Sequence, residues 1–145
     1  MLVRDLMSSP AVTIGPSDAV ARAAQVLDRL GLTSLPVVDH ERRLLGVIGE
    51  VEVIRAVAVE DRREAGDRPR VADASVRDVM SCDVPTADAD DDLADVIAGL
   101  RERGVKSLPV LLHGRVVGMI SRRDVVHAMV DEGLREHPSP ELAPA

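Results

Sequence analysis

The sequence predicts an α+β fold made of two βαββα units that pack sheet to sheet with pseudo-two-fold symmetry. The first observation is an internal repeat, because the pattern of Val3–Met7 (VRDLM) returns 73 residues later at Val76–Met80 (VRDVM). The second is the text Ser-Leu-Pro-Val, which stands at residues 34–37 and again at 107–110. Two copies indicate a duplicated unit that closes on itself and not a solenoid. One copy is too short to cover its own sheet and both of its helices, so the copies must pack together.

In the first copy, a short apolar strand over Ala11–Ile14 leads into a helix whose apolar residues recur at helical spacing as far as Leu30. Ser17 or Asp18 is the expected N-cap of this helix. Gly31 should end it, since glycine readily adopts the left-handed backbone of a helix C-terminus. The remaining elements of this copy are expected to be strands over Leu35–Val38 and Leu44–Ile48, and a helix from Glu50 that turns Val51, Ile54, Val57 and Ala58 inward.

The second copy repeats this plan. The His113-Gly114 step between two apolar runs predicts a two-residue β-hairpin. The expected elements are a strand near Val84–Thr86, a helix from Asp91 to Arg103, strands over Ser107–Leu112 and Val116–Ile120, and a helix from Arg122 to Leu134.

These expectations divide the chain into a first repeat over residues 1–65, a linker over 66–74, a second repeat over 75–135 and a tail over 136–145. Glycine, proline and charged residues stand together in the linker, and the prolines of the tail predict disorder there. Because the linker is short, the two repeats should pack directly on each other.

Composition restricts the classes of function. A chain of 145 residues with 46% apolar residues can build a core. The net charge of −7 argues against nucleic-acid binding, and the absence of Phe, Tyr and Trp removes the usual stacking platforms for bases. No apolar run approaches the length of a membrane span, and no signal pattern opens the chain. The single cysteine, Cys82, suits a reducing compartment, so a soluble cytoplasmic protein is expected.

No residue set in the sequence predicts catalysis or metal binding. The four histidines show no paired metal-ligand spacing. Asp88, Asp90 and Asp92 alternate like calcium-loop ligands, but Leu93 and Gly99 stand where such a loop needs a glycine and a glutamate. Acidic residues at a helix N-terminus explain the run better. With no nucleophile, acid and base set, and no phosphate loop, the chain is expected to be a non-enzyme that requires no cofactor.

These residues resemble a known family, the CBS-domain pair, also called a Bateman module. The marks are the opening Val-Arg-Asp-(Leu/Val)-Met, the Ser-Leu-Pro-Val before each hairpin and the Gly-(Val/Met)-Ile before the last helix of each copy. Residues 121–124 (Ser-Arg-Arg-Asp) are similar to the ribose and phosphate motif of that family. The resemblance covers residues 3–130. It implies a sensor of AMP, ADP, ATP or S-adenosylmethionine that dimerises into a flat disc.

Ser121 and Asp124 support two interpretations. At a helix N-terminus, free N–H groups and the helix dipole attract anions, so a Ser hydroxyl there can add a donor to a phosphate. A carboxylate one turn later can accept both hydroxyls of a ribose diol. The alternative is a capping box, in which the serine caps the helix and the acid returns the hydrogen bond. The two arrangements can also hold in different states of the protein.

The resemblance places further residues around this site. Lys106, Arg122 and Arg123 would offset phosphate charge, although each is also ordinary surface charge in a solvated chain. Arg122 is the weakest of the three, because neighbouring helix residues point in different directions. Apolar residues would hold the adenine end, although core packing is the alternative for each of them: Val84, Thr86, Val105 and Pro109.

The first copy departs from the motif. Its matching step is Gly49-Glu50-Val51-Glu52, which lacks the hydroxyl, lengthens the acid and adds a second negative charge. This combination should disfavour a phosphate. The first copy is expected to bind nothing, or an uncharged or cationic group.

The predicted function is a stand-alone regulatory or sensor module that binds an adenine nucleotide or adenosyl ligand, mainly at the site of the second repeat. A homodimer and an unidentified effector protein are the expected protein partners, with no nucleic acid and no membrane. The alternative is a ligand-free structural or dimerisation module with a vestigial pocket, which the altered first copy favours.

Overall fold

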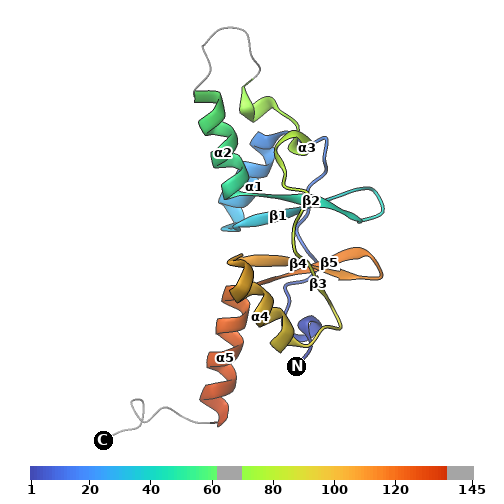
Figure 1. The fold of residues 1–145 in the computed structure, drawn as a ribbon, viewed down its shortest axis with the longest axis vertical. Coiled ribbons are helices and arrows are strands. Elements are labelled where there is room, and N and C mark those ends of the chain that lie inside the picture. The colour runs from blue at the N-terminus through green and yellow to red at the C-terminus, as the bar shows by residue number, and fades with distance from the viewer. Residues whose placement is uncertain (62–69, 137–145) are drawn as a thin grey trace, which may run out of the picture.

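The computed structural model describes residues 1–61 and 70–136. Two sheets lie face to face in the middle of the molecule, and the helices cover their outer sides (Figure 1). This arrangement of two similar halves confirms the predicted α+β fold. The first half contains α1 (Val20–Leu30), β1 (Ser34–Val38), β2 (Leu44–Gly49) and α2 (Glu50–Asp61), and the second contains α3 (Val76–Val79), β3 (Ala87–Asp88), α4 (Leu93–Arg103), β4 (Ser107–Leu112), β5 (Arg115–Ser121) and α5 (Arg122–Glu136).

The two hairpins have equivalent registers. Ser34 of β1 pairs with Gly49 of β2, and Ser107 of β4 pairs with Ser121 of β5. His113 and Gly114 have φ angles of 53° and 77°, as a two-residue turn of the expected kind requires. The hairpin expected from the sequence is therefore confirmed, and its register carries Ser121 to the start of α5.

The first strand of each copy differs from expectation. No strand forms over Ala11–Ile14, where a single parallel bridge joins Ile14 to Val37. In the second copy the strand is β3, just after the expected Val84–Thr86. The reason is that each of these segments first pairs with the other half of the molecule, and only then reaches its own sheet. Ser8, for example, exchanges backbone hydrogen bonds of 2.9 and 3.0 Å with Met119 of β5.

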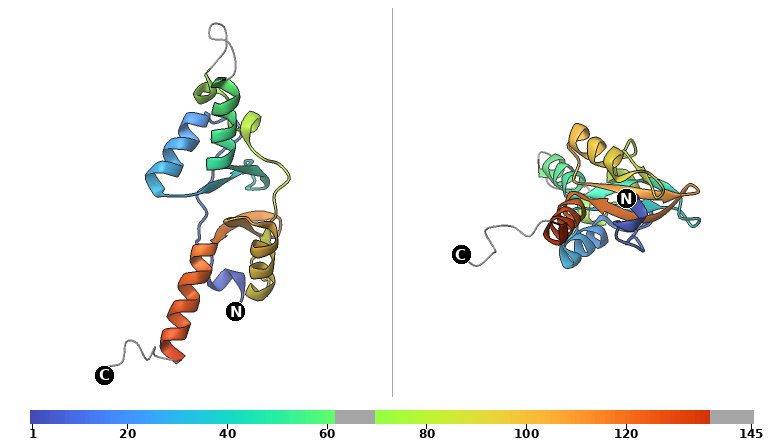
Figure 2. Two further views of the ribbon diagram at one scale, coloured as in Figure 1. Left: turned by 60° about the vertical axis from the view of Figure 1, so that its left-hand side comes forward. Right: turned by 90° about the horizontal axis from the view of Figure 1, so that it is seen from below.

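The opening segment of each repeat packs on the opposite half. Val3 is fully buried in the core of the second half, and Val76 is fully buried in the core of the first. Figure 2 shows the N-terminal segment running from one half to the other. Glycines permit these crossings, since a Cβ on Gly118 would lie 2.7 Å from the Ser8 carbonyl oxygen, and one on Gly46 would lie 2.6 Å from that of Ser81.

The crossing also explains how α1 begins. The expected side-chain cap at Ser17 or Asp18 is wrong, because the N-cap is Ala19 and no side chain caps the helix. The Val20 N–H instead donates to the Ala74 carbonyl oxygen of the crossing segment at 2.9 Å. At the other end, Gly31 has a φ of 63°, which confirms it as the left-handed end of the helix.

The expected inward face of α2 is wrong. Ile54 is 66% exposed, and Val51, Val57 and Ala58 are exposed as well. The helix packs through another face, with Val53 against the core. Helix α5 is similar, since Val126, Met129 and Val130 are exposed, with Met129 at 65%. Both helices lie along the same side of the molecule (Figure 1).

Two parts of the expected domain plan lie outside the described residues. These are residues 62–69, which include the first part of the expected linker, and 137–145, which make up nearly all of the expected tail. Of the remaining linker, Val71–Asp73 forms one turn of 3-10 helix.

Candidate ligand-binding site

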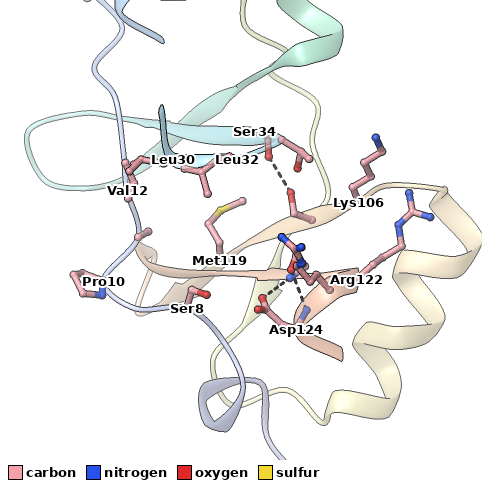
Figure 3. A pocket seen from close by; sticks show the side chains of 16 residues that line it. Ser8, Pro10, Val12, Leu30, Leu32, Ser34, Lys106, Met119, Arg122 and Asp124 are labelled. Carbon is pink, nitrogen blue, oxygen red and sulfur yellow. Dashed lines mark hydrogen bonds between the residues drawn. The ribbon is translucent and has the colours of Figure 1, made fainter. Parts of the chain in front are cut away.

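A cavity of 610 Å³ opens between the two halves at the start of α5. Its walls come from the crossing segment that follows Ser8, from the turn between α1 and β1, and from the second hairpin with α5. Apolar side chains gather at one end and charged side chains at the other (Figure 3). The apolar end includes Val12, Leu30, Leu32 and Met119, and the charged end Lys106, Arg122, Arg123 and Asp124.

Ser121 and Asp124 form the capping box. The Asp124 N–H donates to Ser121 Oγ at 3.1 Å, and the Ser121 N–H donates to Asp124 Oδ2 at 2.9 Å (Figure 3). Both residues also line the cavity. Among the described residues, nothing donates to Asp124 Oδ1, so this oxygen is open to a hydroxyl. Helix capping and ligand recognition are therefore compatible in one arrangement.

Three cations stand at the charged end of the cavity. Lys106, Arg122 and Arg123 are all exposed and line its wall, as does Arg122, the weakest candidate by sequence. Within the described part of the chain none of them forms an ion pair, and Asp124 is the single carboxylate on this wall. The cavity therefore carries a positive charge in an acidic protein, which favours an anionic group.

The structure does not bring the expected adenine-end residues to this cavity. Val84, Val105 and Pro109 line a second cavity of 360 Å³, and Thr86 lines a third of 400 Å³. The reason is the crossing of the chain, since the segment at Val84 belongs to the second repeat in sequence but packs beside the first. The repeat offset of 73 residues gives Ala11 as the counterpart of Val84 and Leu32 as that of Val105, and both line the cavity of Ser121.

The apolar wall was therefore missed by reasoning from the sequence. The signal that was available is the repeat offset itself, but it points to these residues only once the exchange of segments is known. The residues missed are Ser8, Pro10, Ala11, Val12, Leu30, Leu32 and Met119.

The second cavity is the counterpart of the first and holds the altered motif. Gly49, Glu50 and Glu52 line it, and four residues line both cavities: Thr33, Ser34, Lys106 and Ser107. The Ser34 and Ser107 hydroxyls lie 2.9 Å apart, so equivalent serines of the two repeats meet between the two cavities. A Cβ on Gly49 would lie 2.5 Å from the Thr33 carbonyl oxygen, so this position has no room for a serine.

Two further searches return nothing in the described residues. No group of three His, Cys, Asp or Glu side chains there is placed to hold a metal ion. None of the helices there is long and apolar enough to cross a membrane.

Comparisons with known proteins agree with this geometry. The chain is 23% identical to the CBS domain pair of protein MJ0100, solved with 5′-methylthioadenosine and S-adenosyl-L-methionine, with a TM-score of 0.77 over 91% of this chain and 98% of that one. It is also 23% identical to CBSX2, solved with AMP, with a TM-score of 0.76 over 90% of this chain and 97% of that one. At these identities the likeness shows the fold.

A curated relative is larger than this chain. The homoserine O-acetyltransferase of Methanococcus vannielii is 27% identical over 129 residues, which are 88% of this chain and 25% of that enzyme. The chain thus spans about a quarter of the enzyme. The family model described as the CBS domain matches this chain twice, at residues 3–59 and 76–131. The chain belongs to the CBS-domain family, as a tandem pair of CBS repeats.

Proposed function

We propose that this protein is a regulatory module that binds an adenine nucleotide or adenosyl ligand in the 610 Å³ cavity at the start of α5. The observation that carries the proposal is the pairing, in one cavity, of unpaired cations with the open oxygen of Asp124. The CBS pairs of MJ0100 and CBSX2, solved with adenosyl ligands and AMP, support the adenosine body of the ligand.

The two ends of the cavity match the two ends of a nucleotide. Lys106 and Arg123 would hold a phosphate group, because charge-assisted hydrogen bonds to phosphate are the strong ones. Asp124 Oδ1 would accept from the ribose hydroxyls while Oδ2 keeps its bond to the Ser121 N–H. The base would lie against aliphatic side chains such as Leu32 and Met119, since the chain has no aromatic residue to stack on it.

Regulation follows if the ligand favours one arrangement of the two halves over another. The cavity walls come from both halves and from the crossing segment, so an occupant touches all three. The exposed apolar faces of α2 and α5 would receive a second copy of the chain, because contiguous exposed apolar surface marks interaction sites. A partner protein would then read the arrangement of this homodimer. In this role the chain is a sensor and not an enzyme.

A second candidate function is a ligand-free dimerisation module. Two observations favour it: the capping box already satisfies one oxygen of Asp124, and the first repeat has lost its motif at Gly49.

Thermal unfolding with AMP, ADP, ATP and S-adenosylmethionine separates the two candidates. A ligand at about 100 times its dissociation constant should stabilise the fold by about 2.7 kcal/mol. The variant Asp124→Asn tests the site, because an asparagine keeps an oxygen for the Ser121 N–H but presents an amide donor to the ribose. It should bind the ribose-bearing ligand more weakly with little change in stability, whereas the control Glu52→Gln in the second cavity should bind it like the native protein. No stabilisation by any ligand at millimolar concentration would favour the dimerisation module.

A further inference from the structure

The second cavity has the shape of a ligand site but a different chemistry. Its volume of 360 Å³ is within the range of small-molecule pockets. Val47, Val84, Val105 and Pro109 give it an apolar wall, and like the first cavity it is built from both halves of the molecule.

Its charge is opposite to that of the first cavity. Glu50 stands where the second repeat has Arg122, and Asp83 stands where the first crossing segment has Pro10. Glu52 keeps the acid of Asp124. Lys106 is the one cation on this wall, against three carboxylates. The reversal therefore occurs on two separate segments, the start of α2 and the crossing segment, which face the same space.

The site of phosphate recognition is also closed off here. The hydroxyl of Ser121 is replaced by Gly49, whose Cβ position is blocked by the Thr33 carbonyl oxygen at 2.5 Å. Glu50 and Glu52 offset the positive end of the α2 dipole, so an anion would gain little from it. An apolar wall beside carboxylates instead suits a molecule that joins an apolar body to a positive charge.

We propose that the second cavity binds a small cationic molecule, an amine or a sulfonium with an apolar body, so that the two cavities select ligands of opposite charge. The proposal rests on the proposed function only for the adenosine body of the test ligands below.

The shared wall couples the two cavities. Lys106 lines both of them, and its single ammonium group cannot neutralise a phosphate in one and carboxylates in the other equally well. An anion in the first cavity that engages Lys106 makes the second cavity more negative. The anion and the cation should therefore each strengthen the binding of the other, as linkage requires.

Three ligands with the same body and different charge test the proposal. These are 5′-amino-5′-deoxyadenosine, adenosine and AMP, titrated by calorimetry and by methyl NMR of the native chain. The amine should bind more tightly than adenosine and shift the methyl signals of Val84 and Val105, which line the second cavity. AMP should shift those of Val12 and Met119, which line the first. Saturation with AMP should tighten binding of the amine.

A pair of variants locates the charge. Glu50→Gln with Glu52→Gln should weaken binding of the amine about tenfold, as expected for two partly exposed charge pairs, and leave AMP affinity within about twofold, a small fraction of the free energy of binding. The control Glu41→Gln with Glu102→Gln changes the net charge equally at exposed positions outside both cavities and should leave both affinities unchanged.

The outcomes distinguish the two proposals. If AMP binds and the amine binds no better than adenosine, or shifts Met119 in place of Val105, the charge-selective second cavity is refuted and the proposed function stands. If AMP fails to bind while the amine shifts Val105, the proposed function fails and the second cavity stands. An equal loss of amine affinity in the control variant would also refute the second site.

Discussion

At the scale of single residues, glycines decide which backbones approach each other. Gly46, Gly49 and Gly118 each face a carbonyl oxygen at a distance that no Cβ would tolerate. Two of them admit the crossing segments, and the third closes the motif of the first repeat. The sequence shows them as ordinary strand glycines, and their role follows only from what lies across from them.

Gly118→Ala should destabilise the fold by about 1–3 kcal/mol, the usual cost of forcing an extra carbon into a packed site. The new Cβ would lie 2.7 Å from the Ser8 carbonyl oxygen and 2.8 Å from Met7 Sδ. The control is Gly99→Ala, where nothing lies within 4 Å, in the interior of α4. That change should stabilise the protein by about 0.5–1 kcal/mol. Urea unfolding of both variants measures the difference, and equal stabilities would contradict the crossing contact.

Gly49→Ser should fail to create a phosphate site in the second cavity, although it restores the hydroxyl of the motif. The serine Cβ would meet the Thr33 carbonyl oxygen, so the backbone must shift and stability should fall by about 1–3 kcal/mol. Calorimetry with AMP, read together with unfolding, checks both parts. A second AMP site in a variant of native stability would show that the glycine is a simple loss of the hydroxyl.

Asp39 gives a pH dependence at the first hairpin. The N–H groups of Arg43 and Glu41 donate to its carboxylate, which lowers the pKa of Asp39 below the ordinary 3.8. Because the folded pKa lies below the unfolded one, this stabilisation is complete above pH 3.8 and is lost as the pH falls through the folded pKa. The native protein should thus be more stable than Asp39→Asn at pH 7, and the gap should narrow in acid. Urea unfolding across this range tests it, and a gap that is constant with pH would contradict the assignment.

At the scale of elements, the crossing segments join the two halves more than the linker does. Each segment contributes one fully buried valine to the opposite core, and each bonds to a helix start and a strand there. The strands β1, β4 and β5 were predictable because continuous apolar runs and a His-Gly turn are local signals. The crossing was not predictable, since the same valine would be buried equally well in either core.

Val3→Ala should destabilise the protein by about 2 kcal/mol, through a cavity in the second half. Its effect on methyl NMR signals should reach Leu100 and Val110, which share its core, and spare Leu27, which lies in the other. Leu2→Ala is the control, because Leu2 is exposed and outside both cores. Shifts centred on Leu27 would show that the segment packs on its own repeat.

At the scale of the whole molecule, the two halves meet along the sheets and at the tips of the hairpins. The Val116 N–H donates to the Arg42 carbonyl oxygen at 2.9 Å, so the two hairpins are hydrogen-bonded at one end. The exposed apolar faces of α2 and α5 lie on the opposite side from the hairpin tips (Figure 1). One side of the molecule is therefore closed internally, and the other is free for a partner.

Ile54→Glu combined with Met129→Glu should convert the proposed homodimer into monomers. Both side chains are largely exposed, at 66% and 65%, so a charge there opposes association but not folding. Light scattering after gel filtration gives the mass, and circular dichroism gives the fold. The double variant Glu41→Gln, Glu102→Gln, at exposed positions away from these faces, should keep the native mass. A native chain that is already monomeric would refute the dimer.

The sequence by itself determined the duplication, the βαββα order and the residues of the capping box, because repeats, apolar periodicity and short turns are local properties of the chain. It also showed that the first copy had lost the motif. Only the tertiary structure decided which wall faces Ser121, because the opening segments exchange partners between two nearly equivalent cores. For the same reason it alone decided that Val84, Val105 and Pro109 lie beside Glu50, and that Ala11 and Leu32 lie beside the cations. A pattern that repeats every 73 residues fits both pairings equally, and only packing in three dimensions distinguishes them.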